Sequence, residues 1–104
     1  MNFKTHNDKD INSNGTCLQG NVTTKYSRLI ELFGPPTNGD EYKTDAEWNI
    51  EFNSGEVATV YNWKDGKNYL GEEGLDVENI TDWHIGGKKQ IVVNKIKNLI
   101  LEGN

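Results

Sequence analysis

The chain has 104 residues, of which 34% are hydrophobic and 26% charged, so it forms one domain around a single modest core, and a multidomain enzyme is excluded. Three Trp, four Tyr and three Phe supply large apolar surfaces that disordered chains lack. The net charge of −5 argues against direct binding to nucleic acid, because Lys and Arg contacts with phosphates supply most of the non-specific affinity, and it suits a partner protein with a basic surface.

The beginning of the chain is polar and rich in Asn, Asp and Lys, so we predict a flexible tail over residues 1–16 and a single domain over residues 17–104. Within the tail, Asp10 to Gly15 matches the opening of a calcium-binding loop, whose closing position requires a bidentate carboxylate. That position is Asn21, whose amide carries no charge. We therefore predict no metal site there.

A helix is predicted over about residues 24–33, after a short first strand over residues 18–22. Its apolar residues recur at i, i+3, i+4 and i+7, which places them on one helical face: Tyr26, Leu29, Ile30 and Phe33. Thr23 or Thr24 is expected to cap the start of the helix. After it, Gly34 suits the left-handed conformation that ends helices, and the two prolines that follow prevent continuation.

An antiparallel hairpin is predicted over about residues 46–52 and 57–63. In the first segment, AEWNIEF, apolar residues alternate with acidic and amide residues, so one face of the strand is apolar and the other acidic. The second segment, VATVYNW, is rich in β-branched and aromatic residues. The four residues between them, NSGE, have turn chemistry, which joins the two strands into a hairpin.

The remaining chain is predicted as a loop, a short strand and a helix. Residues 65–79 hold three Gly and five acidic residues, which indicates a loop so long that it has a task of its own or is mobile. Residues 81–85 suit a short strand that Gly86-Gly87 breaks. Apolar residues at helical spacing then predict a helix over about residues 88–101. The whole order favours an α+β fold, a small antiparallel sheet with a central hairpin packed by two helices.

No pattern typical of a catalytic site occurs in the chain. The serines lack the Gly-x-Ser-x-Gly setting, and no glycine-rich phosphate loop is present. His6, His84 and Cys17 do not make a zinc set, which needs four ligands at defined spacing. We therefore predict a non-enzymatic protein without cofactors. A lone cysteine, no membrane-length apolar run and no signal-peptide core predict a cytoplasmic location.

The stretch YNWKDGKNYLG, residues 61–71, has two interpretations. In the first, its aromatic residues end the second hairpin strand and fold back on the core. In the second, it binds a partner or ligand, because stacking faces alternate with hydrogen-bond donors. The binding interpretation gives these candidate residues: Asn62, Trp63, Lys64, Lys67, Asn68, Tyr69, Glu72, Glu73 and His84.

Five stretches together resemble a group of small proteins encoded by bacteriophages and prophages: LQGN, LFGPP, DAEWNIEF, VATVYNWKDGKNYLGEEG and DWHIGG. The resemblance spans about residues 18–87 and brings no catalytic residues. Small phage accessory proteins of this size often antagonise host immunity by stoichiometric binding, as anti-CRISPR proteins do. The resemblance therefore implies a phage-encoded anti-defence protein that acts in the host cytoplasm.

Three hypotheses for function remain open from the sequence. The leading one is an inhibitor that binds a host defence protein through the acidic strand face and residues 65–79. The second is a sponge for a small nucleotide immune signal, as in Thoeris antagonists, with Trp63 or Tyr69 stacking on the base and Lys64, Lys67 or Arg28 pairing with phosphate. The third is a phage virion or assembly component. A homodimer is compatible with all three.

Overall fold

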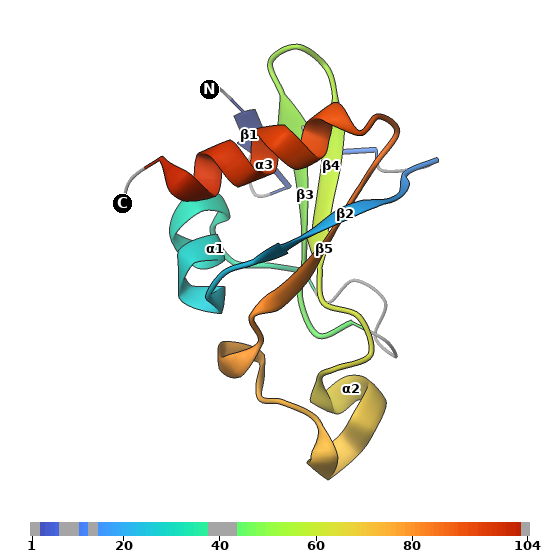
Figure 1. The fold of residues 1–104 in the computed structure, drawn as a ribbon, viewed down its shortest axis with the longest axis vertical. Helices are drawn as coiled ribbons and strands as arrows, with labels where there is room; N and C mark the ends of the chain where they lie inside the picture. The colour runs from blue at the N-terminus through green and yellow to red at the C-terminus, as the bar shows by residue number, and fades with distance from the viewer. Residues whose placement is uncertain (1–2, 7–10, 13–14, 38–43, 103–104) are drawn as a thin grey trace.

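The computed structural model of the chain is an α+β fold in which five antiparallel strands form one sheet, in the order β1-β3-β4-β5-β2 (Figure 1). It describes residues 3–6, 11–12, 15–37 and 44–102. The strands are β1 (Phe3–Thr5), β2 (Cys17–Thr23), β3 (Glu47–Phe52), β4 (Val57–Tyr61) and β5 (Asp82–Gly87). The longer helices are α1 (Tyr26–Phe33) and α3 (Ile91–Leu101). The predicted fold class and central hairpin are confirmed.

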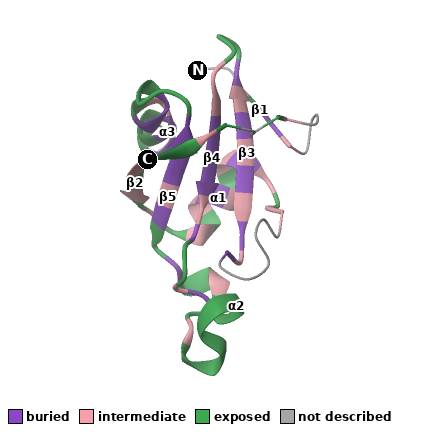
Figure 2. Cartoon of the chain, turned by 90° about the vertical axis from the view of Figure 1, so that its right-hand side faces the viewer, coloured by how far each residue is buried: buried purple, intermediate pink, exposed green. Residues whose placement is uncertain are grey.

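Helices α1 and α3 cover one face of the sheet, and the core lies between these two layers. Figure 2 shows the opposite face turned toward the viewer, with α1 behind the strands. Alternation along β3 explains why only one face of the sheet belongs to the core. Trp48, Ile50 and Phe52 are buried, while the intervening residues are only partly buried. The intervening residues lie on the side of the sheet away from the helices, here called the open face, as the acidic face of the strand predicts.

One short strand lies inside the segment predicted as a flexible tail, and that prediction is wrong for it. Phe3–Thr5 pairs with β3 at the edge of the sheet, and the Phe3 ring packs edge-on against Phe33 at a centroid distance of 5.5 Å. Three residues are too few to show a period in the sequence, so pattern analysis misses the strand. Asp10 and Asn14 of the calcium-like motif lie outside the described residues.

The ends of the predicted helices and strands also need correction. Lys25 is the N-cap residue of α1 and no side chain caps it, because Thr23 belongs to β2 and the Thr24 N–H donates to the Thr81 carbonyl at 2.9 Å. Gly34 does take a positive φ of 81°, as predicted.

Gly86 and Gly87 do not break the last strand, contrary to the prediction, since β5 runs through both. A Cβ at Gly87 would lie 2.6 Å from Val92 Cγ2. The glycine therefore lets α3 pack closely on the sheet. The start of the last helix moves accordingly, from the predicted residue 88 to Ile91.

Residues 65–79, predicted as a long loop that has a task or is mobile, form a folded excursion, here called the distal segment. It contains the short helix α2 (Lys67–Leu70) and two 3-10 turns, η1 (Gly71–Glu73) and η2 (Val77–Asn79). The Leu75 N–H donates to the Asp65 carbonyl at 3.0 Å, which closes the excursion near its base. In Figure 1 it projects beyond one end of the sheet, where α2 is labelled.

Candidate functional site

Three of the predicted binding residues come together where β4 runs into the distal segment. The ammonium group of Lys64 lies 5.8 Å from the ring centroid of Trp63 and 5.4 Å from that of Tyr69. Lys64 has a φ of 62°, which is unusual for a residue other than glycine and is concentrated at functional sites. Both rings stay more than one-third exposed, Trp63 at 39% and Tyr69 at 36%.

The distal segment exposes two more large hydrophobic side chains beside a dense set of carboxylates. Leu70 is 44% exposed and Leu75 47%, although burying such side chains would be favourable. Glu72 and Glu73 are exposed on η1 between them. The candidate residues of this segment therefore face solvent as a mixed apolar and acidic surface.

Asn62 is a structural residue and not the exposed ligand contact that the binding interpretation predicts. Its side chain is fully buried. The Oδ1 atom accepts from the N–H groups of Asp45 at 2.7 Å and Ala46 at 3.1 Å, while Nδ2 donates to the carboxylates of Asp45 at 3.1 Å and Asp65 at 3.0 Å. These four bonds use the full hydrogen-bonding capacity of the Asn62 amide. They anchor the base of the distal segment.

Asn68 and Lys67 also take part in contacts within the chain. Asn68 Nδ2 donates to the Thr44 carbonyl at 3.0 Å, so this amide ties α2 back to the start of β3. Lys67 pairs with Asp76 across the distal segment at 2.8 Å. The hydrogen bond and charge of Asp76 raise the pKa of Lys67. Neither residue is therefore a free donor.

His84 and Arg28 lie away from the Trp63 cluster. The His84 ring packs against Tyr61 on the open face at a centroid distance of 5.5 Å. Arg28 donates to the carbonyls of Leu99 at 3.2 Å and Ile100 at 3.0 Å, at the end of α3. Because it caps that helix, Arg28 does not join the predicted phosphate-binding set.

A hollow of about 200 Å³ lies on the open face next to Trp63, here called the open-face hollow. Residues from four strands (β2, β3, β4 and β5) and the segments beside them line it, including Thr16, Cys17, Glu47, Thr59, Tyr61, Trp63 and Gly86. A Cβ at Gly86 would lie 2.4 Å from Thr59 Oγ1, so glycine leaves this position open. Burial raises the pKa of Tyr61, and the nearby Glu47 raises it further. The Tyr61 hydroxyl is therefore protonated at neutral pH.

The candidate residues named from the sequence omit Glu47, Thr59 and Tyr61, although the predicted acidic strand face includes Glu47 and the stretch 61–71 includes Tyr61. The outward positions of the hairpin strands were the available signal, since Glu47 and Tyr61 are direct cross-strand partners. These residues lie beside Gly86 only because β4 pairs with β5, and no local sequence pattern shows that pairing. The structure adds these residues to Trp63 and leaves His84 on the far side of Tyr61.

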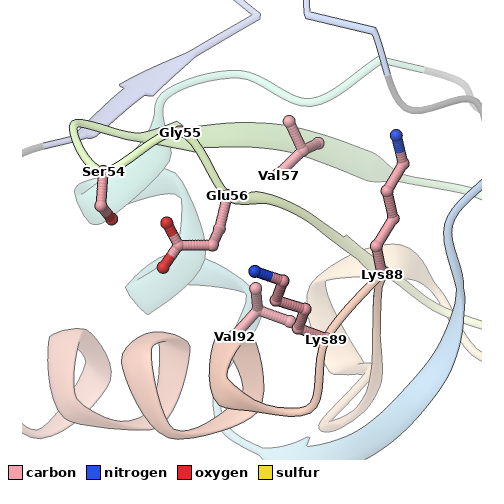
Figure 3. Close-up of a pocket in the computed structure, with 7 residues that line it drawn as sticks. All are labelled: Ser54, Gly55, Glu56, Val57, Lys88, Lys89 and Val92. Carbon is pink, nitrogen blue, oxygen red and sulfur yellow. The ribbon is translucent and has the colours of Figure 1, made fainter.

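A second hollow, of about 290 Å³, lies between the β3–β4 turn and the start of α3 (Figure 3). Glu56 forms an ion pair with Lys95 of α3, which also donates to Ser54 Oγ at 2.8 Å. The hydrogen bonds from Lys95 and Ser54 lower the pKa of Glu56 to about 2. The contacts join the turn to the helix, and we assign this hollow a structural role.

The lowered pKa of Glu56 predicts a pH-dependent contribution to stability. Because the folded-state pKa lies below the ordinary value of 4.5, the contribution is present above that value and is lost as the pH falls toward 2. Glu56→Gln should therefore lower the melting temperature at pH 7, and the gap from wild type should close in acid. Thermal melts across this range measure it, with exposed Glu72→Gln as control. A gap that stays constant with pH would contradict the assignment.

Comparison with protein-family models, with curated proteins and with solved structures finds no match for this chain. Among the described residues, no helix combines the length and apolar character needed to cross a membrane. Within the same ranges, no three acidic, histidine or cysteine side chains gather as a metal site would require.

Proposed function

We propose that this protein is a non-enzymatic inhibitor that docks onto a basic surface of another protein. The docking surface comprises the open face around Trp63 and the distal segment. The observation that carries the proposal is the exposure of Trp63, just before the distal segment, and of Tyr69 and two leucines within that segment, which has five acidic side chains and one lysine. Exposed aromatic anchors surrounded by charge are typical of protein interfaces.

Charge sets the class of partner. The carboxylates of the distal segment and those of Glu47 and Glu51 on β3 belong to the same docking surface, and the whole chain is acidic. Such a surface attracts a basic partner and raises the rate of encounter, while it repels an acidic one. The resemblance of residues 18–87 to phage-encoded proteins supports a host protein as the target, and we propose a bacterial defence protein.

The nucleotide-sponge alternative has weaker support. Of the three cationic candidates for phosphate, Arg28 caps α3 and Lys67 pairs with Asp76, which leaves Lys64 beside a segment of negative charge. The open-face hollow, at about 200 Å³, is smaller than the roughly 300–1,000 Å³ of pockets that hold drug-sized ligands. A protein partner fits these features better than a nucleotide does.

Affinity capture from a host lysate, followed by binding measurements with the purified partner, tests the proposal. Trp63→Ala should weaken binding at least about tenfold, as truncation of a hot-spot aromatic residue does. Leu101→Ala is the matched control, because Leu101 is 69% exposed but lies at the end of α3, away from the docking surface. Both variants should melt within a few degrees of wild type.

Three outcomes would contradict the proposal. The first is the absence of any saturable protein partner, and the second is equal loss of binding in Trp63→Ala and Leu101→Ala. The third is a large thermal shift with a nucleotide, since a ligand at about 100 times its dissociation constant stabilises a fold by about 2.7 kcal/mol. Co-purification with phage particles would instead support the virion hypothesis.

A further inference from the structure

The two edges of the sheet differ in how well they are protected from pairing with another strand. Edge strands present unpaired N–H and C=O groups, and proteins usually shield them by short length, by lysine or proline, or by a bulge. The edge strand β1 has three residues and includes Lys4. The other edge strand, β2, has seven residues, CLQGNVT, none of them charged and none a proline. Figure 2 shows β2 at the left-hand edge of the sheet, next to β5.

A β-bulge disturbs only the first half of β2. The register between β2 and β5 shifts between Leu18 and Gly20, whereas the pairing from Gly20 to Thr23 is regular. A bulge twists an edge strand away from a straight partner, so pairing with a further strand is confined to the regular part. Residues 20–23 are here called the free edge.

The hydrogen bonds to β5 show which backbone groups of the free edge point outward. The Thr24 N–H donates to the Thr81 carbonyl at 2.9 Å, in the same register as the pairing of Val22. In an antiparallel pair, residues that bond to the neighbouring strand alternate with residues that do not. Val22 therefore bonds to β5, while the N–H and C=O groups of Asn21 and Thr23 point away from it.

The outward groups of the free edge have no partner among the described residues. Asn21 and Thr23 are exposed, and Val22 is partly buried. Within the described part of the chain, no backbone hydrogen bond reaches residues 20–23 from any strand other than β5. These groups therefore face water in a single copy, and a further strand can take the place of that water.

The free edge is complementary to a second copy of itself. When a two-fold axis passes beside Val22, Asn21 of one copy lies opposite Thr23 of the other, and the outward groups of both residues donate and accept main-chain hydrogen bonds across the axis. Val22 then lies opposite its own copy on the side that faces the helices, because its neighbour in β5, Trp83, is a core residue.

Charge also favours a second copy over a basic partner protein at this edge. Residues 20–23 carry no charge, so two copies meet here without repulsion between like charges, although the whole chain has a net charge of −5. A basic partner finds no acidic side chain on this strand.

We propose that two copies of this chain pair along the free edge to form a symmetric dimer with one continuous sheet. The two β2 strands are antiparallel, and the helices of both copies lie on the same side of the sheet. This inference goes beyond the proposed function and does not depend on it. Trp63 follows β4, which β5 separates from β2, so each copy keeps its own docking surface.

Sedimentation equilibrium of the full chain, from about 1 μM to about 1 mM, tests the association. The mass should rise toward that of a dimer, and a chain that stays monomeric over this range would overturn the proposal. Hydrogen exchange at both concentrations locates the contact. The amides of Asn21 and Thr23 should become protected as the dimer forms, whereas that of Phe3, on the other edge, should exchange alike. Protection that appears only outside the free edge would also overturn the proposal.

Charge substitution across the axis makes the test specific to this edge. Asn21→Lys combined with Thr23→Lys places lysine opposite lysine, and like charges directly opposite are destabilising, so dimerisation should weaken at least about tenfold. Asn21→Glu combined with Thr23→Glu should have the same effect. An equimolar mixture of the two variants should restore association, because lysine then faces glutamate. The rescue is local, since both variants keep a net negative charge.

Glu72→Gln combined with Glu73→Gln is the matched control, because it changes the net charge as the two lysines do but lies on exposed η1. It should leave the dimer unchanged, and thermal melts show that each variant is folded. Equal weakening by this control, or folded variants whose mixture stays monomeric, would overturn the dimer whether or not a partner protein is captured. Failure to capture a partner would overturn the proposed function and leave the dimer standing.

Discussion

Trp48→Ala should lower the free energy of unfolding by about 3–5 kcal/mol, the range for truncating a large buried aromatic residue. The side chain is fully buried, and its ring lies against Trp83 at a centroid distance of 5.4 Å and Tyr26 at 5.8 Å. Its indole N–H donates to the Gly34 carbonyl at 2.7 Å. Truncation removes the contacts that join β3, β5 and α1, and also the donor for a carbonyl at the end of α1.

Urea unfolding measures this loss, and Trp63→Ala is the matched control. Trp63 is 39% exposed, and substitutions of exposed residues usually change stability by only about 0.5 kcal/mol. Trp48→Ala should reduce partner binding only in proportion to its unfolded fraction, whereas Trp63→Ala should weaken binding at least about tenfold in a folded protein. Equal destabilisation by the two variants would show that the core is not organised around Trp48.

The central part of the fold could be predicted from the sequence because its elements carry a clear period. Alternation over residues 46–52 identifies β3, and the four apolar residues of α1 fall on one helical face. Both patterns arise because each element buries only one side. The same reasoning predicts β5 up to Ile85, where alternation stops and packing against α3 requires glycine.

The edges of the fold and the distal segment could not be predicted in this way. The strand β1 is three residues long, and its place in the sheet comes from Phe3 packing against α1 and β3. The distal segment has no period because its short helical turns are held by hydrogen bonds and by the Lys67–Asp76 pair. Such contacts depend on the folded arrangement and leave no regular pattern.

The candidate site could be predicted only in part, for a similar reason. Composition predicts that residues 61–71 hold both stacking faces and donors, but it does not say which way each amide turns. Trp63, Lys64 and Tyr69 face outward and gather, as the binding interpretation requires. Asn62 turns inward to Asp45, which is 17 residues away in sequence. The stretch therefore holds both a buried anchor and an outward-facing group, and binding by the outward-facing residues stays a prediction.

Asn62→Ala should lower the free energy of unfolding by about 2–4 kcal/mol, because it leaves several buried or partly buried partners without their hydrogen bonds and each buried group costs about 1–3 kcal/mol, partly relieved by water. The orphaned groups are the N–H donors of Asp45 and Ala46 and the carboxylates of Asp45 and Asp65. A Cβ at Gly66 would lie 2.0 Å from Asp45 Oδ1, so Asp45 is packed tightly and cannot turn away easily.

Asn62→Asp is the sharper test, because it keeps the shape of the side chain and replaces its donor with a third carboxylate. At neutral pH, that carboxylate faces Asp45 and Asp65, from which Nδ2 lies 3.1 and 3.0 Å away in the wild type, and like charges at this range repel strongly in a buried site. Asn68→Ala is the control, since Asn68 is exposed and should cost less than about 1 kcal/mol. Urea unfolding at pH 7 should therefore rank Asn62→Asp at least as unstable as Asn62→Ala, with Asn68→Ala near wild type. An Asn62→Asp protein as stable as wild type would contradict the anchoring role and return Asn62 to the list of ligand contacts.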